Sequence, residues 1–418
     1  MTKIILSINA GSSSVKISAY AARFREPPKQ LAEAEISGLT APPAQISYLR
    51  GDVRVKSHEE LTGADGVADQ DDAFKMILTT LTGDPELPEI SAKSDISVAC
   101  HRVVHGGDYR TAKLITPDTY HHLERLTDLA PLHNANALHI IRSCMDELPS
   151  ALNVAYFDSQ FHATIPPHIS TYPIDQDIAR NNQLRKYGFH GISYSFITRS
   201  VADYLGRDPS ELSIIALHLG SGASACAIKD GQSWDTSMGL TPLAGLPGAT
   251  RSGSVDPSLV FHYASDVGKL SPSSTKELHI SVAEEILNKQ SGWKALTGTT
   301  NFGVIANSED DPKCKLAFDL LVDRICAFVG SYYVSLGGRV DALVFAGGIG
   351  EKSDKLRAAV VAQTECLGFR LDPKLNAAAI TNVVQDVGKQ YARHRTLVCR
   401  TDEQFEMARG CAENEELW

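Results

Sequence analysis

Three stretches of the chain present a basic side chain among glycines. Arg102 lies in the stretch His101–Gly107, His190 is flanked by glycines, and Arg251 lies in the loop Leu246–Gly253. A guanidinium group can bind a carboxylate or phosphate through two parallel hydrogen bonds, and a rigid loop can hold it against transferring phosphoryl oxygens. The alternatives are a buried ion pair for Arg102, a satisfied polar side chain for His190 and an exposed side chain for Arg251.

Two acidic residues accompany these cations. Asp158 follows the apolar stretch Tyr156–Phe157, and a carboxylate at a strand end in an α/β protein commonly lies near the ligand crevice. Its alternative role is a helix cap. Glu403 follows Thr401 and Asp402, either of which can cap a helix that begins there. The more specific hypothesis, beyond helix capping, is that Glu403 helps to bind magnesium.

Three turns rich in glycine or serine each follow an apolar run. They are Asn9–Ser14, Gly220–Ser224 and Gly347–Glu351. Glycine lets the backbone approach an anion, and successive N–H groups can surround it. One such turn is weak evidence, but three together favour phosphate binding. None matches GxxxxGK[ST] or a clean GxGxxG after the first strand, which disfavours a P-loop kinase and a Rossmann dehydrogenase.

The elements that would position these residues alternate between strand and helix patterns. Strands are predicted at 3–8, 15–20, 44–49, 96–101, 214–219, 225–229 and 342–346, and helices at 71–81 and 352–361. This alternation predicts an α/β fold. The order strand, small-residue turn, strand occurs near both 9–14 and 220–224, which indicates two domains of like topology.

Length and composition narrow the class of function. The 418 residues are 43% hydrophobic, a length that favours two domains. The net charge is −10 and no Lys/Arg run exceeds two residues, which argues against nucleic-acid binding. None of the eight cysteines forms a CxxC pair, so reduced thiols are expected. With no signal-peptide core and no membrane-length apolar run, we expect a soluble cytoplasmic protein that does not bind membranes.

Seven motifs occur in the order found in acetate kinases, and the chain resembles that family over nearly its whole length. The motifs are Asn9–Lys16, His101–Gly107, Ala130–Asn134, Phe157–Asp158, Lys186–Gly191, Thr250–Gly253 and Gly347–Glu351. The resemblance implies an actin-like ATPase (ribonuclease H-like) fold, in which two related α/β domains flank a central cleft. It implies an N-terminal domain of residues 1–157 plus 400–418, a nucleotide-binding domain of residues 158–399, and a homodimer.

The resemblance also implies reversible phosphoryl transfer between ATP and acetate, giving acetyl phosphate and ADP. Asn9 and Glu403 would serve a Mg²⁺ (or Mn²⁺) ion, largely through bound water. The nucleotide and its phosphates would be lined by Lys16, His218, Leu219, Gly220, Ser221, Gly222, Asn301, Phe302, Gly303, Gly347, Gly348, Ile349, Gly350 and Glu351.

On the acceptor side, Arg102 would bind the acetate carboxylate. The acetate methyl group would be enclosed by Val104, Leu132, Phe189 and Pro242. Arg251 and His190 would stabilise the transferring phosphoryl group, and Asp158 would orient Arg251 or a magnesium-bound water. No general base is needed, because a carboxylic acid with a pKa of about 4 is ionised at neutral pH.

Departures from the family pattern leave alternatives open. Ser221 and Lys352 stand where Asn is common, and Asn301–Gly303 stands where Asp-Phe-Arg is common. ATP is the expected donor and diphosphate the alternative. A propionate-preferring kinase is the nearest enzyme alternative, because one methylene is worth only about 1–3 kcal/mol in a pocket. A non-catalytic switch of the actin or Hsp70 kind would not need Arg102, His190 and Arg251 together.

Overall fold

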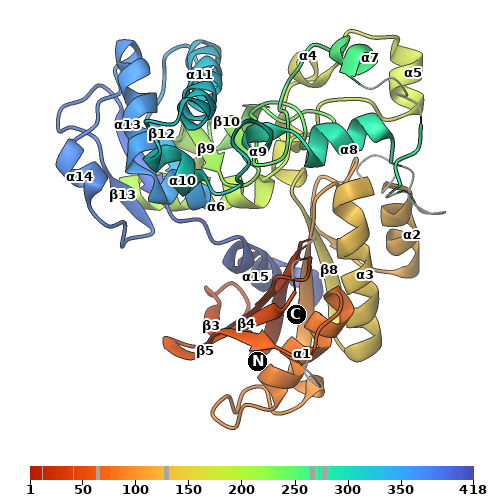
Figure 1. Ribbon diagram of the computed structural model, residues 1–418. Helices are drawn as coiled ribbons and strands as arrows, with labels where there is room; N and C mark the ends of the chain where they lie inside the picture. The colour runs from red at the N-terminus through yellow and green to blue at the C-terminus, as the bar shows by residue number, and fades with distance from the viewer. Residues whose placement is uncertain are drawn as a thin grey trace. The chain divides into compact units, whose positions relative to one another are not determined.

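The chain folds into two compact units, each built on one mixed sheet. The structure, a computed structural model, describes residues 1–11, 13–40, 42–62, 66–126, 131–263, 269–272, 274 and 280–418, with the backbone alone at 131–133. Unit 1 comprises Met1–Gln160 and Asp402–Trp418, and unit 2 comprises Phe161–Thr401. Figure 1 shows both units, and each is described by itself below.

The sheet of unit 1 has eight strands in the order β5-β4-β3-β2-β1-β6-β8-β7. Strands β1 to β5 form antiparallel pairs, and β6 runs parallel to both β1 and β8. The strands are β1 (Lys3–Ala10), β2 (Ser14–Ala22), β3 (Lys29–Ser37), β4 (Ala44–Arg50), β5 (Val53–Leu61), β6 (Ile96–Val103), β7 (Lys113–Leu114) and β8 (Leu152–Phe157). The helices are α1 (Gln70–Thr82), α2 (Pro117–Leu126), α3 (Pro131–Glu147) and α15 (Glu403–Glu413).

Alternation along β1 decides which helices cover each face of this sheet. Ile4, Leu6 and Ile8 are buried in a core shared with α1 and α3. Ser7 points to the opposite face, because successive side chains of a strand alternate. There its hydroxyl donates to the backbone carbonyl of Gln404 on α15 at 2.6 Å. A helix from the far end of the chain therefore completes the sheet of unit 1.

The sheet of unit 2 has six strands in the order β11-β10-β9-β12-β14-β13. Its strands are β9 (Ile214–Leu219), β10 (Ala223–Lys229), β11 (Gln232–Thr236), β12 (Ala342–Ala346), β13 (Val384–Asp386) and β14 (Arg395–Cys399). Its helices are α4 (Pro167–Ser170), α5 (Gln176–Asn181), α6 (Gly191–Leu205), α7 (Leu259–Tyr263), α8 (Val282–Lys289), α9 (Gly292–Thr297), α10 (Phe302–Asn307), α11 (Pro312–Ser335), α12 (Gly347–Lys352), α13 (Asp354–Gln363) and α14 (Pro373–Ala377).

The central strand β9 separates two environments in the same way as β1. Ile215, Leu217 and Leu219 are fully buried in a core that includes side chains of α11. His218 lies on the other face, where its Nδ1 is 2.8 Å from the hydroxyl of Ser193 on α6. The polar side chain of β9 therefore lies on the face of the sheet that contacts α6.

The two sheets share a topology. In unit 1 the antiparallel strands β3, β2 and β1 lead to the parallel strands β6 and β8, and in unit 2 β11, β10 and β9 lead to β12 and β14. The predicted class, two related α/β domains, is confirmed. In such sheets ligands commonly bind beyond the carboxyl ends of parallel strands.

The predicted elements agree with the structure except at one junction. The strands expected at 3–8, 96–101, 214–219 and 342–346 are confirmed, as is the helix at 71–81. The helix predicted at 352–361 is confirmed as α13, but the turn predicted at 347–351 was wrong, because these residues form a helix of their own, α12, which begins at Gly347. Gly347 permits this sharp entry, since its φ is +73° and a Cβ there would lie 2.8 Å from the carbonyl oxygen of Leu219.

We predict that His101 makes unit 1 sensitive to acid. This side chain is 2% exposed, and burial lowers its pKa from 6.5 to about 4. The unfolded chain therefore binds a proton that the folded chain excludes, so the stabilisation is present above pH 6.5 and is lost as the pH falls toward 4. The expected loss is roughly 2 kcal/mol between pH 7 and pH 5.

Urea unfolding measured from pH 4 to pH 8 tests this prediction. A His101→Gln variant keeps an amide donor for Asn153, the 2.8 Å partner of the imidazole, but cannot titrate. It should show a shallower pH dependence than the parent, whereas the exposed-site control His121→Gln should not. Equal slopes for the parent and His101→Gln would contradict the assignment.

Candidate functional site

Two basic residues that the sequence analysis singled out, Arg251 and His190, meet at the turn between β9 and β10. A Cβ built on Gly222 would lie 2.9 Å from Nη1 of Arg251 and 3.6 Å from Nε2 of His190. The guanidinium and the imidazole therefore occupy the space over a residue that has no side chain. Backbone N–H groups of a turn and two side-chain donors at one point suit a tetrahedral anion such as a phosphoryl group.

Main-chain hydrogen bonds hold the Arg251 loop against this turn. The N–H of Ala249 donates to the carbonyl of Ser221 at 2.8 Å, and the N–H of Gly248 donates to the carbonyl of Arg251 at 3.0 Å. A Cβ on Gly248 would lie 2.7 Å from the same Ser221 oxygen. Glycine at 248 therefore permits the close approach, and Arg251 is presented by a tightly packed loop.

His190 is held by its backbone and by its ring. Its φ is +59°, a left-handed conformation at the N-cap of α6 that non-glycine residues adopt rarely. The preceding carbonyl, that of Phe189, lies 2.9 Å from Nε2 of the buried His162. The His190 ring stacks on the His218 ring with centroids 4.2 Å apart, and its Nδ1 lies 2.8 Å from the hydroxyl of Ser224.

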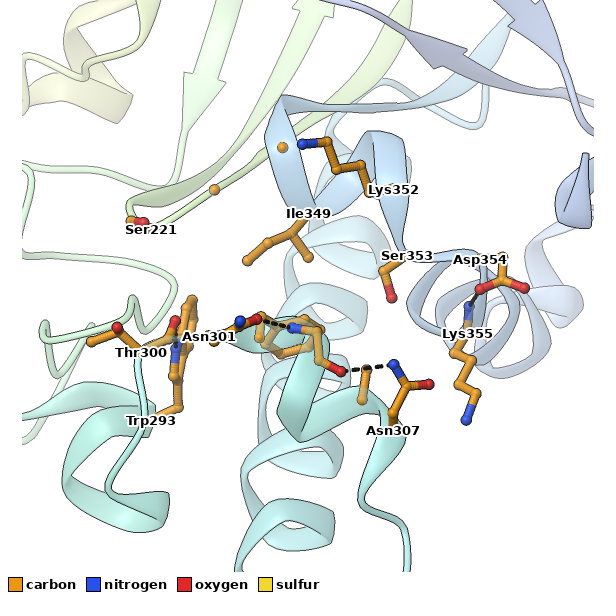
Figure 2. A pocket seen from close by; sticks show the side chains of 15 residues that line it. Ser221, Trp293, Thr300, Asn301, Asn307, Ile349, Lys352, Ser353, Asp354 and Lys355 are labelled. Atoms are coloured by element: carbon orange, nitrogen blue, oxygen red, sulfur yellow. Dashed lines mark hydrogen bonds between the residues drawn. The ribbon is translucent and has the colours of Figure 1, made fainter. Parts of the chain in front are cut away.

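A cavity of about 400 Å³ opens beside the turn between β9 and β10 (Figure 2). We call this turn, Gly220–Gly222, the phosphate turn after the role predicted for it. Its position follows from the sheet, because Ala346 of β12 pairs with His218 of β9 and brings the start of α12 next to the β9–β10 turn. The lining residues are Gly220, Ser221, Trp293, Thr300, Asn301, Phe302, Gly303, Ala306, Asn307, Gly348, Ile349, Lys352, Ser353, Asp354 and Lys355.

Seven residues that the sequence analysis assigned to the nucleotide line this cavity. They are Gly220, Ser221, Asn301, Phe302, Gly303, Gly348 and Ile349. Trp293, Thr300 and Asn307 belong to no recognised motif and come from short helices and their connections. The Asn301 carboxamide also caps α10, accepting from the N–H of Gly303 at 2.9 Å.

Other residues that were predicted to bind the nucleotide do not line this cavity. Glu351 instead borders a neighbouring cavity with Arg357 and Arg400, and it accepts a hydrogen bond from the N–H of Thr401 at 3.3 Å. Burial is the main reason that the pKa of its carboxyl is raised. His218 lies on the α6 face of the sheet, and Gly347 packs against Leu219.

Arg357 is a buried arginine that sequence reasoning missed. Its side chain is 2% exposed, and Nη1 donates to the carbonyls of Gly350 and Glu351 at 2.9 and 2.8 Å. Nε and Nη2 donate to the side chain and backbone oxygens of Asn376 at 2.7 and 2.8 Å. The guanidinium thus fixes the end of α12 against α13 and α14. No local motif marks such a role, because all its partners are main-chain or distant groups.

Unit 1 gathers a second set of charged residues at the carboxyl ends of its parallel strands. Asp158 is 1% exposed and accepts from Nε and Nη2 of Arg102 at 3.0 and 2.7 Å. Glu403, at the start of α15, lies 3.2 Å from Nη1 of the same guanidinium. Asp402 caps that helix, as predicted, by accepting from the N–H of Phe405 at 2.8 Å. Within unit 1, the partner of Asp158 is therefore Arg102.

This acidic group fits a hard divalent cation held mainly through water. Burial is the main reason that the pKa of Glu403 is raised, and the negative charges of Asp158 and Asp402 add to it, while Arg102 opposes it. Carboxylate oxygens are the ligands that Mg²⁺ prefers, and Mg²⁺ usually keeps several waters. Among the described residues, no three His, Cys, Asp or Glu side chains form a ready-made metal cage.

The remaining predicted residues fall in both units. In unit 1, Lys16 forms an ion pair with Glu33 at 2.9 Å and is the β2 partner of Asn9, the residue before the last of β1. Val104 is half-buried directly after β6. In unit 2, Phe189 is 1% exposed and Pro242 is buried. Leu132 lies in α3, but its side chain is outside the described residues, as are Ser12 and Ala130 of the predicted motifs.

The two mixed sheets of shared topology define an α/β protein of the actin-like ATPase class. The chain belongs to the acetokinase family, whose model matches residues 4–409. It is 63% identical to a probable acetate kinase of Chaetomium globosum, with 100% of this chain and 99% of the relative covered.

Two solved structures share this fold along almost the whole chain. A propionate kinase from Francisella tularensis is 31% identical with a TM-score of 0.83, covering 98% of each chain. The acetate kinase of Porphyromonas gingivalis is 30% identical with a TM-score of 0.79, covering 97% of this chain and 98% of its own. Separately, no α-helix among the described residues has the length and apolar character needed to cross a bilayer.

We predict that Arg357 is a major stabiliser of unit 2. Arg357→Met would leave buried carbonyl oxygens of Gly350, Glu351 and Asn376 without their donor. Each unsatisfied buried group costs about 1–3 kcal/mol, so we expect a loss of roughly 3–5 kcal/mol in unfolding free energy. Urea unfolding measures this loss.

The matched control for Arg357 is Arg324→Met on α11, where the guanidinium is exposed. That change should cost less than about 1 kcal/mol. Arg357→Lys should recover part of the loss, since an ammonium group can donate to some of the same oxygens. Equal stability of Arg357→Met and Arg324→Met would contradict the role.

Proposed function

We propose that this protein is an acetate kinase that transfers a phosphoryl group reversibly between ATP and acetate, giving acetyl phosphate and ADP. The observation that carries the proposal is the meeting of Arg251 and His190 over Gly222, next to the cavity of unit 2. Membership of the acetokinase family and 63% identity to a probable acetate kinase support the same activity.

The donor nucleotide is assigned to the cavity of unit 2. Its 400 Å³ and its mixed lining of aromatic, amide and glycine residues suit a nucleoside, and Gly220 and Ser221 place the phosphate turn at its border. Figure 2 shows the Lys352 side chain on the same wall as Ile349. Arg251 and His190 then stabilise charge on the transferring group, which is the main task in phosphoryl transfer.

The acceptor carboxylate is assigned to Arg102. Its guanidinium has five N–H donors, and the contacts with Asp158 and Glu403 leave capacity for a further oxygen. Asp158 holds the guanidinium through two hydrogen bonds and so fixes its direction. Acetate needs no deprotonation at neutral pH, so a carboxylate at Asp158 serves to position and to balance charge.

A magnesium ion and a homodimer complete the proposal. Glu403 and Asn9 would serve the metal through water, in the acidic group formed with Asp158 and Asp402. A divalent cation supplies charge neutralisation on the donor phosphates. The dimer rests on the family resemblance, and sedimentation velocity would detect it.

Propionate is the second candidate acceptor, because a propionate kinase shares the fold with a TM-score of 0.83. Phe189 and Pro242, both buried, favour a small pocket and therefore acetate. Diphosphate remains the alternative donor, since the Asn301–Gly303 stretch carries no charged side chain.

A hydroxamate assay of acyl phosphate formation tests the activity directly. Acetate and propionate are each combined with ATP or diphosphate in the presence of Mg²⁺. We expect acetate with ATP to give the highest kcat/KM, because the cavity accommodates a nucleoside that diphosphate lacks. Hydrolysis of ATP without any acyl phosphate would refute the proposal and favour a nucleotide-driven switch.

We further predict that Arg251→Ala lowers kcat by about 10²–10³, the usual cost of removing one preorganised charge-stabilising donor. Arg102→Ala should lower kcat/KM for acetate by a similar factor. Nucleotide affinity, measured by calorimetry, should change far less in both variants. Arg324→Ala is the matched surface control, and unchanged turnover in Arg251→Ala would end its assignment.

A further inference from the structure

A chain of hydrogen bonds leads from the buried core of unit 2 to His190. The hydroxyl of Tyr194 lies 2.6 Å from the hydroxyl of Ser224, which lies 2.8 Å from Nδ1 of His190. Tyr194 and Ser224 are fully buried, and His190 is 8% exposed. Both contacts join side chains and are not part of the main-chain hydrogen bonding of a helix or a sheet. Their common end point is the imidazole of His190.

The direction of each bond follows from which groups have protons to give. Among the described residues, the Ser224 hydroxyl is the side-chain hydrogen-bond partner of the fully buried Tyr194 hydroxyl, so the single Tyr194 proton is directed to Ser224. Ser224 then donates its own proton to Nδ1 of His190, because its oxygen already accepts from Tyr194. Nδ1 is left as an acceptor, and the ring proton of neutral His190 resides on Nε2.

We propose that Ser224 and Tyr194 are positioning residues that fix His190 as the Nε2–H tautomer, aimed at the phosphate turn. Nε2 faces the space over Gly222, the same point that Nη1 of Arg251 approaches. The Nε2 proton therefore points toward the space where phosphoryl oxygens are assigned, and this inference rests on the proposed function for that assignment. Among the described residues, the titratable and charged groups that face the ring include His218, stacked at 4.2 Å, Arg251 and, through Ser224, Tyr194.

The arrangement makes a neutral imidazole a reliable donor. A hydroxyl that donates to Nδ1 stabilises the neutral ring, since protonation at Nδ1 would set two donors against each other. The cationic Arg251 beside Nε2 acts in the same direction. Removing the Ser224 hydroxyl should therefore let His190 take up a proton at higher pH and let the ring rotate.

NMR of the full-length protein labelled with ¹⁵N-histidine tests the proposal. Two-bond ¹H–¹⁵N correlations report which ring nitrogen carries the proton, and His190→Gln identifies the signals. In the parent protein near neutral pH we expect an unprotonated Nδ1 and a protonated Nε2. Ser224→Ala should raise the pH at which His190 titrates, and Tyr194→Phe should do so to a smaller extent.

Kinetics supply the second measurement. Ser224→Ala should lower kcat about tenfold, with KM for both substrates changed less than twofold, and Ser224→Thr should restore most of the loss by returning a hydroxyl. Thr198→Val is the matched control, because it removes a buried hydroxyl of α6 that donates to the Tyr194 carbonyl and not to the relay. It should leave both the His190 signals and turnover unchanged.

A protonated Nδ1 in the parent protein would overturn the proposal, as would identical His190 signals in Ser224→Ala and the parent. The NMR result does not depend on turnover. Failure of the parent protein to form acetyl phosphate would instead refute the proposed function, while the tautomer assignment would stand or fall on the spectra alone.

Discussion

The site in unit 2 depends on glycine at position 222, because this residue has no side chain to occupy the space beside Arg251 and His190. Nη1 of Arg251 lies 2.9 Å from the position that a Cβ would take, and Nε2 of His190 lies 3.6 Å from it. Alanine at this position would push the Arg251 guanidinium aside, while the His190 ring would remain at an ordinary contact distance. The loop that carries Arg251 is itself fixed to Ser221 by a main-chain hydrogen bond. The turn therefore does more than expose backbone N–H groups. It also brings the two side chains proposed to act on one anion, those of Arg251 and His190, to the same point.

Charge is arranged differently in the two units. In unit 2 the groups around the turn are cationic or neutral, which suits a polyanionic donor. In unit 1, Arg102 lies between Asp158 and Glu403, and further carboxylates lie near Lys16. Such pairing keeps the partly buried guanidinium in one orientation, and the carboxylates supply negative charge that suits the divalent cation proposed above. Each set lies at the carboxyl ends of parallel strands, so one topology produces both.

The features that sequence predicted best are local ones. Apolar runs identify β1, β9 and β12, and the glycines after them identify the turns, because both depend on neighbouring residues. The start of α12 was missed, since it depends on how Gly347 packs against β9. Arg357 carries no motif, and Ser224 was noted only as the last residue of the turn Gly220–Ser224, because the roles of both arise from partners that only the tertiary structure brings near. The resemblance to acetate kinases named the residues of the phosphate turn but said nothing of what holds them.

The helix α15 has a consequence for how the molecule is made. Gln404 exchanges hydrogen bonds with Ser7 and Ser18 in the sheet of unit 1, and 397 residues separate it from Ser7. During synthesis on the ribosome, β1 and β2 emerge early with one face of their sheet uncovered. Unit 2, by contrast, is continuous and can complete its core before α15 appears. The nascent chain therefore carries an unfinished first unit until its last residues have been made.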